Sequence, residues 1–202
     1  CGLNQPQDVA AGAAACFAGF VVVPDSPRFL TSAAAAPLVD QARALGMAPV
    51  GVFRDSPPAS VAATAARLNL PAVQLHGREN EDDIAALRAA LRPDTEIWKA
   101  ASVGRDSLDP RGADRIVFDH GDGGSGQAFD WRLVAGRADL GRHLIAGGIG
   151  SYNARDASAL GAFAVDVGSS LDALPGRKSA ERIRDFFEAL RPASRQGLRQ
   201  CA

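Results

Sequence analysis

The chain has 202 residues, of which 47% are hydrophobic, and its formal net charge at pH 7 is −1. A chain of this length can bury a full hydrophobic core and fits one large domain better than two small ones. The near-neutral charge argues against a nucleic-acid partner, and no apolar run approaches the roughly 20 residues that a membrane span needs. Three cysteines at wide spacing suggest neither a disulfide framework nor a zinc site. We therefore expect a cytoplasmic protein without a metal ion.

Seven short apolar runs bounded by turn-forming residues are typical of buried parallel strands. They span residues 20–23, 49–53, 72–75, 97–100, 115–119, 143–146 and 164–167. Helical spacing predicts helices at residues 5–14, 32–45, 57–68 and 81–91, a weak one at 106–110, a short one from residue 130, and two more at 151–160 and 178–190. This alternation of strands and helices predicts an α/β fold with a parallel sheet.

Residues at the predicted helix ends support these assignments. Ser32 and Ser151 stand where N-caps are expected, and Pro6 and Pro57 fit the first turn of a helix. In the last predicted helix the apolar residues fall on one face, which is typical of an amphipathic helix; they are Ile183, Phe186, Phe187 and Leu190.

The alternation favours a closed (β/α)8 barrel, although seven strands are predicted where a barrel needs eight. The shortage lies at the start, because Cys1 is followed at once by a turn and a helix, as a chain is just after a first strand. We expect most of the first strand to be absent from this chain. The alternative, an open doubly wound sheet, would favour a GxGxxG turn near the start, which is not found. Residues 1–190 are expected to form a single barrel domain and residues 191–202 a flexible tail.

A carboxylate followed by a glycine-rich loop is the most informative local pattern. Asp119 ends the apolar run of residues 116–118, and the loop after it contains Gly121, Gly123, Gly124 and Gly126. A carboxylate at the mouth of a buried strand is better placed for chemistry than for packing, and such a loop can close over a ligand. The alternative is an ordinary surface connection.

In a barrel, the active groups come from the carboxyl ends of the strands and from the loops after them. The side chains at these positions are Cys1, Arg28, His76, Asp119 and Asp166. Glycine-bearing turns follow the last two strands, at residues 146–148 and 166–170, where barrels bind phosphate through main-chain N–H groups. The pattern therefore predicts a phosphorylated small-molecule substrate.

Eight short strings resemble one family, in order and spacing, from Cys1 to about Leu190. They are CGLNQPQDV, GFVVVPDSPR, VGVF with AVQLHG, IWKA, VFD followed by GGSGQAFDW, LIAGGI, FAVDVGSS and LPGRK. Together they resemble phosphoribosylanthranilate isomerase of tryptophan biosynthesis. The order in the last loop, Gly168-Ser169-Ser170-Leu171-Asp172, departs from the family pattern and leaves the individual phosphate contacts there open.

The resemblance implies a (β/α)8 barrel that rearranges N-(5-phosphoribosyl)anthranilate into 1-(2-carboxyphenylamino)-1-deoxyribulose 5-phosphate without a cofactor. Asp119 would be the general acid and Cys1 the general base. Arg28 would pair with the anthranilate carboxylate, and His76 and Asp166 would contact or orient the substrate. The phosphate would be held by Gly147, Gly148, Gly168 and Ser169.

Each of these assignments has a structural alternative. Cys1 could be a packing residue, Arg28 a solvated surface charge, His76 a hydrogen-bonded core histidine and Asp166 a brace for its loop. The whole chain could be a barrel that binds a phosphorylated metabolite without turnover, or an isomerase domain cut from a fusion with indole-glycerol-phosphate synthase. A synthase itself would need catalytic lysines, and only Lys99 ends a predicted strand. We expect a monomer or a homodimer.

Overall fold

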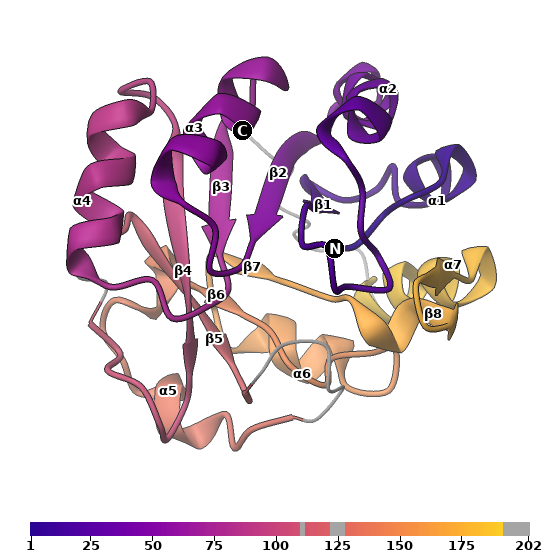
Figure 1. Ribbon diagram of the computed structural model, residues 1–202. Helices are drawn as coiled ribbons and strands as arrows, with labels where there is room; N and C mark the ends of the chain where they lie inside the picture. The colour runs from indigo at the N-terminus through magenta and orange to yellow at the C-terminus, as the bar shows by residue number, and fades with distance from the viewer. Residues whose placement is uncertain (110–111, 122–127, 192–202) are drawn as a thin grey trace.

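The computed structural model describes residues 1–109, 112–121 and 128–191. Seven parallel strands form one sheet in which each strand pairs with the next along the chain. They are β1 (Phe17–Val21), β2 (Ala48–Phe53), β3 (Ala72–Leu75), β4 (Glu96–Ser102), β5 (Arg115–Asp119), β6 (Leu144–Ile145) and β7 (Ala164–Val165). The sheet curls round with the helices outside it (Figure 1). All seven predicted strands are present, although β1 begins three residues earlier than predicted and β4 extends to Ser102, and the architecture is a (β/α)8 barrel with a reduced first strand.

Residues 1–3 lie between the carboxyl ends of β7 and β1. The amide nitrogens of Gly2 and Leu3 donate to the carbonyl oxygen of Gly19 in β1, at 2.8 and 3.1 Å. On the other side, the main-chain nitrogen of Cys1 donates to the carbonyl oxygen of Val167, just after β7, at 2.7 Å. These contacts join the two edges of the sheet at the end where barrel enzymes carry their active sites.

The helices cover the outer face of the sheet. They are α1 (Pro6–Ala11), α2 (Ser32–Ala44), α3 (Pro58–Arg67), α4 (Glu81–Ala90), α5 (Arg132–Ala135), α6 (Ala154–Ala159) and α7 (Ala180–Leu190). Two short 3-10 helices, η1 (Leu140–Arg142) and η2 (Ser169–Leu171), precede β6 and the hairpin of β8 (Asp172–Leu174) and β9 (Arg177–Lys178). The sequence analysis did not predict this hairpin.

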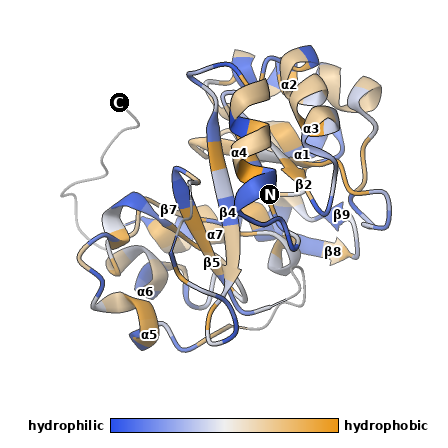
Figure 2. Ribbon diagram, turned by 60° about the vertical axis from the view of Figure 1, so that its left-hand side comes forward, coloured by the Kyte–Doolittle hydropathy of each residue, from blue (hydrophilic) through white to orange (hydrophobic). Residues whose placement is uncertain are grey.

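The hydrophobic core has an inner and an outer layer, because successive strand residues face opposite sides of the sheet. Inside the barrel, Val50, Trp98, Val117 and Leu144 belong to one buried cluster, and the ring of Phe17 meets that of Trp98 edge to face at 5.1 Å. Outside, the strands pack against the apolar faces of the helices. Figure 2 shows hydrophobic residues along the strands and mixed composition along the helices.

Two predicted N-caps are wrong. Thr31 caps α2, since its Oγ1 accepts from the amide nitrogen of Ala34 at 3.1 Å, and Ser32 is already the first helical residue. At α6 the N-cap is Asn153, because the glycine turn before the helix extends past Ser151. Each error arises where two or more polar residues precede a helix, so that composition alone does not select the cap.

Other helix predictions need smaller corrections. The last helix begins two residues later than predicted, because Lys178 belongs to β9 and Ser179 caps α7 by accepting from the amide nitrogen of Arg182 at 3.2 Å. Pro57 is the N-cap residue of α3 and Pro58 occupies its first turn. Residues 106–109 are not helical, and residue 110, the end of that predicted helix, lies outside the described residues.

Candidate active site

The carboxyl ends of the strands surround a cavity of about 450 Å³. All the residues that the sequence nominated for catalysis or binding line it: Cys1, Arg28, His76, Asp119, Gly147, Gly148, Asp166, Gly168 and Ser169. They come from the ends of five strands and from the N-terminal segment, so the barrel topology brings them together from both ends of the chain.

The two-residue period of a strand explains why the titratable side chains reach this cavity. Val117 of β5 lies in the cluster inside the barrel, and Asp119 follows two residues later on the same face. Asp166 follows Ala164 of β7 in the same way. The apolar residues therefore fill the interior of the barrel, and the polar residues lie at the carboxyl ends of the strands.

The thiol of Cys1 lies in a space that exists because residue 19 is a glycine. A Cβ atom at Gly19 would stand 2.8 Å from Sγ of Cys1, closer than such atoms approach one another. The half-buried side chain of Cys1 also packs against the cluster of Val21, Val23 and Val52. The thiol is thus held on an apolar wall of the cavity.

The carboxyl group of Asp119 is buried, with 6% of the residue exposed. Its Oδ1 accepts from the main-chain nitrogen of His120 at 2.7 Å, and its Oδ2 lies 3.2 Å from Nε2 of His76. This distance suits a hydrogen bond, but the alignment does not complete one. Nε2 of His76 therefore lies close to the carboxyl group of Asp119 without forming a hydrogen bond to it.

Gln74 contacts the other nitrogen of the His76 ring. Its Nε2 lies 3.0 Å from Nδ1 of His76, and Gln74 itself is 3% exposed. With the amide in this orientation Nδ1 accepts, so the proton of a neutral His76 is on Nε2, facing Asp119. The Nε2–H group of His76 therefore points toward Oδ2 of Asp119.

The predicted phosphate turns lie side by side at the cavity. Gly147 and Gly148 have φ values of +78° and +60°, a left-handed conformation that favours glycine. The carbonyl oxygen of Gly148 accepts from Nδ2 of Asn153 at 3.0 Å, and Oγ of Ser170 donates to the carbonyl oxygen of Ile149. With these carbonyls bonded to the protein, the main-chain N–H groups of the turns are the groups suited to an anion.

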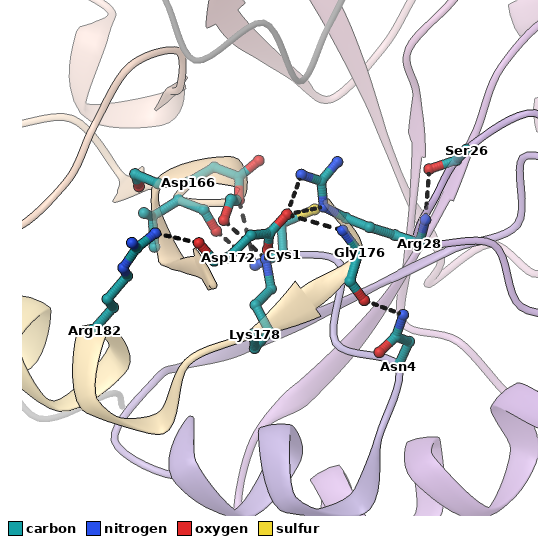
Figure 3. A network of polar contacts seen from close by, with 12 residues as sticks. Cys1, Asn4, Ser26, Arg28, Asp166, Asp172, Gly176, Lys178 and Arg182 are labelled. Atoms are coloured by element: carbon teal, nitrogen blue, oxygen red, sulfur yellow. Dashed lines mark hydrogen bonds and ion pairs between the residues drawn. The ribbon is translucent and has the colours of Figure 1, made fainter. Parts of the chain in front are cut away.

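The side chain of Arg28 lines the cavity and is paired with the carboxylate of Asp172. Its Nε donates to Oδ2 of Asp172 at 3.1 Å, and its Nη2 also contacts that oxygen. Figure 3 shows this pair beside Cys1 and Lys178. Asp166 lies in the same group, with its Oδ1 3.9 Å from the main-chain nitrogen of Cys1.

The sequence analysis singled out two other features: Lys99, which lies inside β4 and not at its end, and the glycine-rich loop after Asp119. Lys99 does not line the cavity of Cys1, and its Nζ is taken by Oε2 of Glu79 at 3.2 Å and by the carbonyl oxygen of Gly77 at 2.8 Å. The glycine-rich loop that was expected to close over a ligand is described only up to Gly121, and residues 123–126 of it lie outside the described residues.

A family model described as N-(5'phosphoribosyl)anthranilate (PRA) isomerase matches residues 1–189. The chain belongs to this family. A curated relative of similar length, the N-(5'-phosphoribosyl)anthranilate isomerase of Paracoccus denitrificans, is 37% identical over 208 residues, which cover 93% of each chain. The tryptophan biosynthesis protein TrpCF of Yersinia pestis is 43% identical over 196 residues, which cover 95% of this chain and 40% of that protein. The chain therefore spans about two fifths of the TrpCF relatives it matches.

Solved structures of phosphoribosylanthranilate isomerases share the fold. The enzyme from Thermus thermophilus has a TM-score of 0.81 at 30% identity, with 94% of this chain and 96% of that chain covered. A phosphoribosylanthranilate isomerase in complex with reduced 1-(o-carboxyphenylamino)-1-deoxyribulose 5-phosphate has a TM-score of 0.75 at 25% identity, with 94% and 95% covered.

The sequence analysis missed three side chains that contact the nominated residues or their partners: Gln74, Asp172 and Lys178. Gln74 carried a signal, because a single amide inside the apolar run of residues 72–75 is costly to bury without a partner. Lys178 stood in the string LPGRK, but Asp172 carried no signal, because Arg28 is remote in the sequence and the hairpin was not predicted.

Proposed function

We propose that this chain converts N-(5-phosphoribosyl)anthranilate into 1-(2-carboxyphenylamino)-1-deoxyribulose 5-phosphate by an Amadori rearrangement. The observation that carries the proposal is that Cys1 and Asp119 line one cavity together with the glycine turns after β6 and β7. A base, an acid and an anion site in one cavity are what the reaction needs.

In the first step Asp119 protonates the ring oxygen of the ribose. The bond between C1 and that oxygen breaks, and the nitrogen lone pair forms a protonated Schiff base at C1. The proton of Asp119 is now on the sugar hydroxyl. The carboxylate that remains faces Nε2 of His76, at 3.2 Å, and the main-chain nitrogen of His120, at 2.7 Å. Both contacts favour the charged product of the step.

In the second step the thiolate of Cys1 removes the proton from C2. The electron pair of that C–H bond forms the C1–C2 double bond and neutralises the iminium nitrogen. The enolamine takes a proton at C1 from the Cys1 thiol and gives the proton of its C2 hydroxyl to the Asp119 carboxylate, which yields the ketone and restores both groups. C1 is reduced and C2 oxidised within one molecule, so this chemistry calls for no external oxidant or reductant.

The two charged ends of the substrate are assigned to opposite sides of the cavity. Main-chain N–H groups of the glycine turns, at Gly147, Gly148 and Gly168, take the phosphate with Ser169. The guanidinium of Arg28 takes the anthranilate carboxylate. Asp166 and His76 then flank the sugar between these ends, where they orient its hydroxyl groups.

The test is the loss of substrate fluorescence when the purified chain is added to freshly prepared phosphoribosylanthranilate. We expect turnover by the wild-type chain and a fall of about 10²-fold or more for Cys1→Ser and for Asp119→Asn, the usual contribution of a general base or acid. Lys99→Met is the matched control, because Lys99 lies within β4 and does not line this cavity. Unchanged turnover in the Cys1 and Asp119 variants would refute their roles, and a wild-type chain that binds but does not turn over would be a binding protein.

For the setting of this activity, we propose a cytoplasmic protein that acts as a monomer or a homodimer on a small phosphorylated substrate and binds neither nucleic acid nor membranes. Within the part of the chain that the structure describes, no helix is long and apolar enough to cross a membrane. One solved relative, from Thermotoga maritima, is described as dimeric. Sedimentation of the purified chain distinguishes the two assembly states.

A further inference from the structure

Asp172 is the centre of a polar network that none of the catalytic steps above uses. The residue is 6% exposed, and its carboxylate accepts from Nε and Nη2 of Arg28, from Nζ of Lys178 at 2.6 Å and from the amide nitrogen of Gly176 at 3.3 Å. Its main-chain carbonyl accepts from Arg182. Figure 3 shows these contacts converging on one side chain.

We propose that Asp172 and Lys178 form a positioning pair that aims the guanidinium of Arg28 at the carboxylate end of the substrate and ties it to the loop that holds the phosphate. This inference rests on the proposed function and adds two residues to it. Neither residue touches the reacting atoms.

Asp172 binds one edge of the Arg28 guanidinium and leaves the other edge free. A guanidinium has five N–H donors, and its planar edges each fit one carboxylate. Asp172 occupies the edge formed by Nε and Nη2, at a side chain that is 14% exposed. The edge formed by Nη1 and the second proton of Nη2 is left for a ligand. A second carboxylate can therefore bind Arg28 while Asp172 stays in place.

The charges of the network suit an anion even though a carboxylate sits in its centre. Burial opposes the ionised form of Asp172, but the hydrogen bond and charge of Lys178, and those of Arg28, hold its pKa below the ordinary value. The cations Arg28 and Lys178 balance the carboxylates of Asp172 and the nearby Asp166, so no net negative charge is left beside Arg28. The site can attract the substrate carboxylate without a mobile side chain.

Lys178 connects Asp172 to the turn that is assigned to the phosphate. Its ammonium group is 1% exposed and donates both to Asp172 and to the carbonyl oxygen of Gly168, at 2.8 Å. Gly168 begins the turn that is assigned to the phosphate. A chain of three polar contacts thus runs from Arg28 to that turn, and it fixes the separation of the two anion sites.

The β8–β9 hairpin holds this pair against the loop of Arg28. Gly176, at the turn of the hairpin, has φ of +77°, and a Cβ atom there would be 2.1 Å from the carbonyl oxygen of Pro27. The carbonyl oxygen of Gly176 also accepts from Nδ2 of Asn4 at 2.8 Å. Only glycine allows so close an approach, so the residue before Arg28 is fixed by the same hairpin.

The experiment compares two ligands that differ only in the group that Arg28 would bind. One is reduced 1-(o-carboxyphenylamino)-1-deoxyribulose 5-phosphate and the other is the same compound without the ring carboxylate, with both affinities measured by calorimetry. For the wild-type chain we expect the carboxylate to improve affinity about 10-fold or more, as charge-assisted hydrogen bonds do. For Asp172→Asn we expect this ratio to fall to about 3 or less, while the affinity for the carboxylate-free compound changes by less than about 3-fold.

Two further variants keep the test decisive. Asp172→Asn alone leaves the Lys178 ammonium buried without a counter-charge, so the double variant Asp172→Asn/Lys178→Met is measured as well, with the same loss of discrimination expected. In an Arg28→Lys background, Asp172→Asn should have no additional effect on the ratio, because Asp172 acts through Arg28. Asp40→Asn, which removes an exposed ion pair on α2, is the control and should leave the ratio unchanged.

A purely structural role predicts something else. It would weaken both ligands equally or lower thermal stability without changing the ratio, and either result overturns the inference. So does a wild-type chain that shows no preference for the carboxylate. Turnover of phosphoribosylanthranilate by the wild-type chain is measured separately, so that loss of the proposed function and loss of this positioning role are read from different assays.

Discussion

Replacing Gly19 by alanine tests whether the position of the Cys1 thiol limits the reaction. The added Cβ would stand 2.8 Å from Sγ and 3.1 Å from Cα of Cys1, so the cysteine has to move by several tenths of an ångström or more. A misplacement of about 1 Å at a reacting group can cost about 10²-fold in rate. We therefore expect Gly19→Ala to lower kcat by about 10- to 100-fold.

The same substitution has a cost in stability that must be separated from its effect on catalysis. Overpacking typically costs about 1–3 kcal/mol, and each kcal/mol lowers the melting temperature of a chain of this size by about 2–4 °C. Gly51→Ala is the matched control, since its Cβ would stand 2.7 Å from Cδ1 of Leu70, on the outer side of the sheet and away from the thiol. Gly136→Ala meets nothing within 4 Å and serves as the neutral control.

The assay combines melting curves with steady-state kinetics on phosphoribosylanthranilate. We expect Gly19→Ala and Gly51→Ala to lose similar stability, but only Gly19→Ala to lose kcat. If Gly19→Ala keeps the wild-type kcat while its melting temperature falls like that of Gly51→Ala, the thiol is not the base and its place on the cavity wall reflects packing alone.

Three other predictions concern protons. Gln74→Leu removes the partner that keeps Nδ1 of His76 an acceptor, so we expect kcat to fall about 10-fold with a shifted pH profile, checked by the ¹⁵N shifts of the His76 ring. Burial raises the pKa of Asp8, so ionisation of this carboxyl group lowers the stability of the fold at a pH above that pKa. Asp8→Asn should therefore raise the free energy of unfolding at pH 7, and this gain should disappear toward pH 4, as measured by urea titrations. The hydrogen bond from Arg137 lowers the pKa of Asp139 to about 2, so stability that is present above pH 4 is lost as the pH falls toward 2. Asp139→Asn should flatten this fall, by less than about 1 kcal/mol because 43% of the side chain is exposed to solvent.

The side chains at the strand ends could be predicted because local sequence patterns determine where a strand lies and which of its residues face inward. Apolar runs locate the strands, the two-residue period decides which side chain faces inward, and the barrel topology gathers those side chains at one end. Asp119 and Asp166 needed no further information to be placed in one cavity. The family resemblance then supplied their roles, which no spacing could give.

What could not be predicted is the network that is set by contacts between remote segments. Arg28 and Asp172 are 144 residues apart in the sequence. Asp172 and Lys178 lie in a hairpin whose strands have three and two residues, too short to show a two-residue period. Gly176 reads as an ordinary turn residue until its closeness to Pro27 is seen. The aim of Arg28 is therefore a property of tertiary packing, whereas its presence at the cavity is a property of the strand that precedes it. A sequence that keeps the arginine and changes the hairpin would keep Arg28 at the cavity and lose the contacts that orient it.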